Sequence, residues 1–138
     1  MTLSEILLHP IGRVESILTD LEAAPRQADE GAPDAWLVLD PAVVPGLEGL
    51  EPGVEVVVLT WLDRASREVL TVHPRGDRAR PEAGVFSTRS PHRPNPIGLH
   101  VVQILGIEGA RLHVSGLEAV DGTPIVDLKP VLAPVADR

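Results

Sequence analysis

Hydrophobic residues along the chain come in short runs bounded by glycine, proline, aspartate and asparagine. Almost nowhere does a 3.6-residue period persist for three helical turns, so the pattern predicts strands and no long helix. We expect strands near residues 11–17, 36–39, 54–62, 69–72, 85–87, 99–105, 111–117 and 125–128. Residues 41–50 predict at most one short helical turn.

Two segments indicate how these strands are arranged. The run 54–62 is apolar on both faces, which predicts a central strand whose end opens into a site. The glycine-containing turn 106–110 predicts an antiparallel hairpin, because glycine adopts positive φ without a clash. Short strands at about ten-residue spacing favour a small barrel or a sandwich over alternating β/α units. The polar, proline-containing segment 19–34 is predicted to be a long loop.

Length and composition then narrow the class of protein. The 138 residues correspond to one domain, and 43% hydrophobic with 23% charged residues is globular composition. The absence of cysteine excludes disulfides, thiolate metal sites and a cysteine nucleophile. The longest apolar run is too short to span a bilayer, and the N-terminus lacks the charged region of a signal peptide. We therefore expect a cytoplasmic protein with no membrane association.

Charge is distributed unevenly along the chain. The formal net charge of −8 argues against a protein that coats nucleic acid through bulk electrostatics. Residues 64–93 nevertheless hold seven of the twelve basic residues against three acidic ones, a local net charge of +4 that leaves −12 for the rest. This window is either solvated surface or the binding region for an anionic ligand.

Several common catalytic signatures are absent. The sequence contains no G-x-G-x-x-G, no G-x-x-x-x-G-K-[ST], no H-E-x-x-H and no G-x-S-x-G. The five histidines are scattered singly, so their spacing predicts no metal site.

Two other segments carry unusual polar patterns. In residues 84–99, three prolines alternate with polar residues between predicted strands, which indicates a rigid wall or a barrel corner. Arg89 and Arg93 in this wall favour a binding role. In residues 117–130, a tight turn at Asp121 precedes a strand in which Asp127 and Lys129 alternate with apolar neighbours. Asp127 and Lys129 are candidates either for chemistry or for a structural cross-strand ion pair.

Both segments resemble motifs of the TrmO family, also called YaeB or VirR-like. The resemblance lies in T-R-S-P-H-R-P-N-P-I-G-L at residues 88–99, in D-G-T-P-I-V-D-L-K-P at residues 121–130, and in P-R-Q at residues 25–27. It extends from residue 11 to residue 130. It implies a non-Rossmann methyltransferase in which one all-β domain, an antiparallel β-barrel of about six to eight strands over residues 1–138, binds S-adenosyl-L-methionine. The resemblance also implies a homodimer with the cofactor near the subunit interface. The sequence matches the short form of the family, without the C-terminal domain of longer members.

The resemblance further implies a reaction and a set of site residues. The family reaction is methylation of N6 of N6-threonylcarbamoyladenosine at position 37 of tRNA. The cofactor-binding residues that carry over are Pro25, Arg26, Gln27, Arg89, Leu99, Asp121, Gly122, Thr123 and Pro124. We add Trp61 and Leu62 at the end of the central strand, where Trp61 either stacks on the adenine or packs in the core. This chain has Trp61 and Leu62 where the best-known members have a His-Gln pair, and Val131 where the family has a tyrosine.

Methyl transfer from a sulfonium depends mainly on placement, since the donor is already activated. The ureido nitrogen of the acceptor would benefit from losing its proton as the new bond forms. Candidate bases are Asp121, Asp127, His92 or the carboxylate of the substrate itself. We expect the substrate to contact Arg78, Arg80, His92, Arg93 and Lys129. Two alternatives keep the cofactor: a methyltransferase with a small-molecule acceptor, and a non-catalytic module that only binds S-adenosylmethionine.

Overall fold

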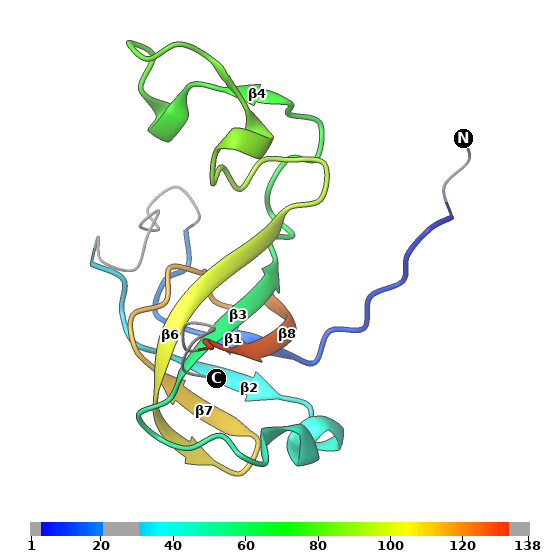
Figure 1. The fold of residues 1–138 in the computed structure, drawn as a ribbon, viewed down its shortest axis with the longest axis vertical. Helices are drawn as coiled ribbons and strands as arrows, with labels where there is room; N and C mark the ends of the chain where they lie inside the picture. Colours follow the sequence, from blue (N-terminus) through cyan, green and yellow to red (C-terminus); the bar gives the residue numbers. More distant parts are fainter. Residues whose placement is uncertain (1–3, 21–30, 133–138) are drawn as a thin grey trace.

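The computed structural model describes residues 4–20 and 31–132. Within them, six antiparallel strands form a closed barrel in the order β1-β2-β7-β6-β3-β8 (Figure 1). These strands are β1 (Gly12–Glu15), β2 (Ala35–Leu39), β3 (Glu55–Trp61), β6 (Ile97–Glu108), β7 (Arg111–Val114) and β8 (Pro124–Pro130). The prediction of an all-β fold is confirmed. The spacing of the strands left a barrel and a sandwich open, and the structure is a barrel.

Strict alternation of side chains builds the interior of the barrel. Along β6, every second residue from Gly98 to Ile104 is buried while those between face outward, as the two-residue period of a strand requires. Strand β3 pairs with β6 over seven positions and with β8 on its other side, which confirms its central place. The buried core contains Val14, Leu37, Val56, Val58, Val102, Ile104, Leu112, Val114, Leu117 and Ile125.

A small lobe, residues 63–96, lies beyond one end of the barrel between β3 and β6 (Figure 1). It contains a two-stranded sheet of β4 (Thr71–Val72) and β5 (Ala83–Gly84), with the short 3-10 helices η3 (Pro74–Gly76) and η4 (Val85–Ser87). We call the barrel end that faces it the lobe end. No helix of the described ranges is long and apolar enough to cross a membrane.

Several predicted boundaries are wrong. Residues 85–87 form η4 and no strand, because the side chain of Arg93 draws the carbonyls of Val85 and Thr88 inward and turns the backbone. The hairpin turn lies at 109–110, since β6 continues to Glu108 through a register shift near Gly106. Strands near 11–17, 69–72 and 111–117 are shorter than predicted. The helical turn predicted within 41–50 is confirmed as η2 (Pro41–Leu47), capped by the side chain of Asp40.

The outer wall formed by β1, β2 and β7 carries a polar cluster. Arg111 donates to Glu15 at 2.9 Å and lies 4.9 Å from the ring centroid of Trp36, which stacks on His113. The hydrogen bond to Glu15 raises the pKa of Arg111, so the guanidinium remains charged. The polar side chains of this outer wall therefore already bind one another.

Candidate functional site

The C-terminal end of β3 is fastened to the proline-rich segment. Trp61, half-buried at this end, lies under the guanidinium of Arg67, whose carbon is 5.2 Å from the ring centroid. Arg67 also donates to the carbonyl of Pro94 at 2.7 Å and to Oδ1 of Asn95 at 2.9 Å. The backbone N–H of Leu62 donates to Pro96 at 2.8 Å. Trp61 and Leu62 thus meet the proline-rich segment where the sequence predicted a site.

Arg93 holds the loop before it in a tight curve. Its guanidinium donates to the carbonyls of Ser90, Val85 and Thr88 at 2.8, 2.7 and 2.6 Å. His92 accepts from the backbone N–H of Ser66 through Nδ1, so the hydrogen of the neutral ring is on Nε2. The structure therefore gives Arg93 a loop-holding role, and substrate contact by Arg93 and His92 stays a prediction.

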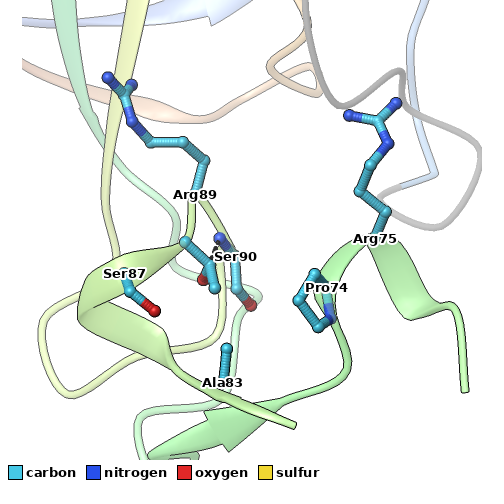
Figure 2. A pocket seen from close by; sticks show the side chains of 7 residues that line it. Pro74, Arg75, Ala83, Ser87, Arg89 and Ser90 are labelled. Carbon is cyan, nitrogen blue, oxygen red and sulfur yellow. Dashed lines mark hydrogen bonds between the residues drawn. The ribbon is translucent and has the colours of Figure 1, made fainter. Parts of the chain in front are cut away.

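A pocket of about 240 Å³ opens between η3 and the segment after η4. Its walls are formed by Pro74, Arg75, Ala83, Ser87, Thr88, Arg89 and Ser90. In Figure 2 the Arg75 and Arg89 side chains rise from two different segments and extend away from Ala83. Guanidinium groups in this arrangement suit a carboxylate or a phosphate.

The hydroxyl groups of this pocket act mainly as acceptors toward a ligand. Ser87 Oγ donates to Gly84 at 2.8 Å, and Thr88 Oγ1 donates to Val85 at 3.0 Å, so both hydroxyl hydrogens are already used. Their remaining lone pairs fit an N–H donor. Arg75 has φ of 55°, a left-handed conformation that non-glycine residues adopt seldom and that is enriched at functional sites.

The predicted Asp-Gly-Thr-Pro turn lies at the lobe end, against the chain that leaves β1. Asp121 accepts the Ser16 N–H on Oδ1 at 2.9 Å, and its own N–H donates to Leu18. Thr123 is buried and its hydroxyl donates to Val120 at 2.7 Å. Gly122 is exposed with φ of 82°, where a side chain would strain the backbone. Because the Gly122 N–H donates to the Val14 carbonyl at 2.7 Å, the turn offers a ligand the Gly122 carbonyl and Asp121 Oδ2.

Asp127 and Lys129 form an ion pair of 3.2 Å, but both lie on β8 two residues apart. The predicted cross-strand pair is therefore wrong in its geometry: side chains at i and i+2 share one face of the same strand. Both groups are about half exposed, on the outer face of the barrel. A catalytic role for Asp127 and a substrate contact for Lys129 stay predictions.

The remaining predicted residues are dispersed. Leu99 faces outward on β6, opposite Leu59 of β3. Arg78 and Arg80 are exposed on the lobe outside the pocket, and Arg80 lies 3.6 Å from Asp77. The P-R-Q segment at 25–27 lies outside the described residues. Among the described residues no group of three histidines or carboxylates gathers in a way that could hold a metal ion.

Sequence reasoning missed the specific roles of Arg67 and Arg75. Both belong to the basic window, so the charge count included them, but nothing distinguished them from solvated arginines. The signal for Arg75 was its place in the His-Pro-Arg-Gly segment 73–76, whose composition is typical of a tight turn. Arg67 carries no local signal, because its hydrogen-bond partners Pro94 and Asn95 lie 27 and 28 residues further along the chain.

Comparison with known proteins links this geometry to a family. The family model described as tRNA-methyltransferase O N-terminal domain matches residues 13–137. An S-adenosyl-L-methionine-binding protein of Archaeoglobus fulgidus is 44% identical over 124 residues, covering 90% of this chain and 88% of the relative. A probable S-adenosyl-L-methionine-binding protein of the same organism is 43% identical over 125 residues, covering 91% of this chain and 34% of that longer relative. The crystal structure of TrmO from P. aeruginosa superposes with a TM-score of 0.75 at 36% identity, covering 99% of this chain and 61% of that chain.

Proposed function

The chain belongs to the tRNA-methyltransferase O N-terminal domain family, and from this premise we propose that it is an S-adenosyl-L-methionine-dependent methyltransferase. We propose N6 of N6-threonylcarbamoyladenosine at position 37 of tRNA as the acceptor. The observation that carries the proposal is that both family motifs lie at the lobe end of the barrel, where they lead into β6 and β8 on the two sides of β3. Residues 92–97 run from the lobe into β6. Asp121 accepts the N–H of Ser16 in the segment that follows β1. Arg64 of the lobe donates to the carbonyl of Thr19 in the same segment.

The residues of the lobe end suit the cofactor chemically. When bound, S-adenosylmethionine supplies a methyl group activated by its sulfonium charge. The proposal gives Arg89 the methionyl carboxylate and gives the carbonyl of the exposed Gly122 the amino group of adenine. Hydroxyl oxygens of Ser87 and Thr88, whose hydrogens are already donated, would accept from an ammonium or a ureido N–H.

The proton of the acceptor nitrogen needs a base at this end. Asp121 uses only Oδ1 to hold the Ser16 N–H, so Oδ2 is the oxygen assigned to accept this proton. Asp127 is the weaker candidate, because its Oδ2 is paired with Lys129 and its Oδ1 accepts the Leu128 N–H. The exposed Arg78 and Arg80 would contact tRNA phosphates.

We further propose that the protein acts as a homodimer. A pocket of about 240 Å³ is smaller than the roughly 300–1,000 Å³ that usually encloses a drug-sized ligand, so a second protomer would enclose the rest of the cofactor. The outer face of β3 and β6 supports this, because three of its four cross-strand pairs are apolar, the fourth being Glu55 with Gln103. The apolar pairs are Val57 with Val101, Leu59 with Leu99, and Trp61 with Ile97. Sedimentation of a Val101→Glu variant as a monomer, against a wild-type dimer, would support this interface, whereas an unchanged dimer would exclude it.

The function is tested by incubating the protein with total tRNA and S-adenosylmethionine labelled in its methyl group. The tRNA is digested, and mass spectrometry searches for label on threonylcarbamoyladenosine. Label there supports the proposal. If calorimetry shows cofactor binding but the tRNA carries no label, the assignment moves to a methyltransferase with a small-molecule acceptor, which the net charge of −8 permits, or to a non-catalytic binding module. Arg89→Gln should lose binding, whereas the exposed barrel residue in Arg13→Gln serves as the matched control.

A further inference from the structure

Three side chains form a buried polar chain inside the lobe end of the barrel. Thr60 Oγ1 lies 2.8 Å from His100 Nε2, and His100 Nδ1 lies 2.7 Å from Glu118 Oε1. The Thr60 and His100 side chains are buried in the barrel interior, and 14% of the Glu118 side chain is exposed. A side-chain Cβ on Gly98 would clash with Thr60 Oγ1 and approach His100 Nε2 to 2.7 Å, so glycine there leaves room for the contact.

The donors and acceptors of this chain have a fixed order when the imidazole is neutral. The Glu118 carboxylate only accepts, so His100 donates through Nδ1, and Nε2 then accepts from the Thr60 hydroxyl. The second carboxylate oxygen, Oε2 of Glu118, is buried and has no hydrogen-bond partner among the described residues. A buried carboxylate oxygen without a donor is destabilising, and well-packed apolar side chains in its place are often at least as stable. Stability alone therefore does not explain why Thr60, His100 and Glu118 occupy these positions.

The polar chain lies beneath residues that the sequence predicts to bind the cofactor. Thr60 directly precedes Trp61, and His100 directly follows Leu99. Alternation along the strands sends Thr60 and His100 inward while Trp61 and Leu99 face outward. Glu118 stands three residues before Asp121, in the segment that leads into the turn.

The two hydrogen bonds of His100 differ in what they hold. The bond to Thr60 joins β6 to β3, which already pair over seven positions. The bond to Glu118 joins β6 to residues 116–123. Within the described structure, the backbone hydrogen bonds of those residues lead elsewhere: to Val14, Leu18 and Pro33, and within the turn.

We propose that His100 is a positioning residue, which holds the segment 118–124 against β6 through Glu118 and so places the Asp121–Pro124 turn for the cofactor. This inference rests on the proposed function, because it assumes that the turn binds S-adenosylmethionine. Without the His100 tether, the turn keeps its bonds to the β1 side but loses its fixed position relative to β6.

Three substitutions separate the two hydrogen bonds. His100→Leu removes both of them. His100→Asn keeps the bond to Glu118, because the asparagine amide nitrogen occupies the place of Nδ1. Thr60→Val removes only the bond between the strands and keeps the side-chain shape. Ile104→Val, a buried β6 change further along the strand, is the control for a general loss of packing.

The measurement is the dissociation constant of S-adenosylmethionine by calorimetry, with the full chain, at a temperature where circular dichroism shows every variant folded. We expect His100→Leu to weaken binding at least about tenfold, while His100→Asn, Thr60→Val and Ile104→Val stay within about threefold of wild type. Wild-type affinity in His100→Leu would overturn the inference, as would equal losses in all four variants. If His100→Leu does not fold, Glu118→Ala replaces it, because Glu118 is the partly exposed member of the three. The same tenfold loss of affinity is expected. Unchanged affinity in Glu118→Ala would count against the inference. A wild-type protein that binds no S-adenosylmethionine would instead refute the proposed function.

Discussion

Replacing Arg93 by methionine should open residues 85–93 while leaving the barrel folded. Arg93 donates three hydrogen bonds to the carbonyls of Ser90, Val85 and Thr88, all from one half-buried guanidinium. Methionine keeps most of the aliphatic stem and removes every donor. The lobe is continuous with the barrel through residues near 62–67 and 92–97, so residues 85–93 can open without breaking the strand pairing of the barrel.

The structure sets the size of the effect. A hydrogen bond to a charged group contributes about 1.5–3 kcal/mol, but carbonyls at a half-buried site regain water once the loop opens. Discounting for this solvation gives about 2–4 kcal/mol for the three bonds together. If exchange occurs through local opening, amide hydrogen exchange in the loop should accelerate by about 30- to 700-fold, up to the limit of full exposure.

Hydrogen exchange followed by mass spectrometry measures this opening directly. The informative amides are those of Thr88, Ser90, His92 and Arg93, which all have acceptors in the lobe. Peptides from β3 and β6 should exchange as in wild type. Arg64→Met is the matched control, since the exposed Arg64 donates one hydrogen bond, to Thr19. Unchanged exchange in the loop, or an equal rise in every barrel peptide, would refute the reasoning.

Three further sets of substitutions test the turn, the lobe surface and the strand interior. Asp121→Ala should weaken cofactor binding in calorimetry. It should also lower the free energy of unfolding by about 1 kcal/mol, because it removes the acceptor of the Ser16 N–H. Asp121→Asn keeps an acceptor oxygen, so it should restore stability in urea titrations but not cofactor affinity. Arg78→Ser with Arg80→Ser should weaken tRNA binding more than cofactor binding, and should reduce the slope of log affinity against log salt by about 2; equal losses of both ligands would place these arginines inside the cofactor site. Gly98→Ala should destabilise the fold by about 1–3 kcal/mol in urea, because its Cβ meets two buried side chains, while Gly106→Ala, with open space around it, should change stability little.

Local patterns were sufficient for the barrel because its strands obey one simple rule. Where polar and apolar residues alternate, as along β7, the sequence indicates directly which side chains face inward. The same rule failed at residues 85–87. Val85 is buried there, but Phe86 is 81% exposed, and the backbone is turned by an arginine eight residues away. A short apolar run does not reveal such a contact.

The candidate site shows a similar division. Asp121 was identified from its turn and from the resemblance, yet its partner Ser16 lies 105 residues away in sequence. The Thr60, His100 and Glu118 chain was not anticipated, because its members are separated by 40 and 18 residues. A single inward histidine in a strand looks like an ordinary core residue until the fold supplies both partners. Side-chain networks of this kind depend on strand register and loop path, which local spacing does not determine.

The closed barrel limits how two copies of this chain could associate. A closed sheet has no free edge, so a partner cannot join it by adding a strand to the barrel, and association must use an outer face. The face over β1, β2 and β7 is occupied by the cluster of Glu15, Trp36, Arg111 and His113, whose charged groups already have partners. The face over β3 and β6 instead presents paired apolar side chains, with Leu99 and Val101 almost half exposed. That face ends at Trp61, at the lobe end of the barrel. A dimer formed through it would therefore bring a second protomer to the proposed cofactor site. In such a dimer, Val101→Glu on this face should reduce both association and cofactor affinity.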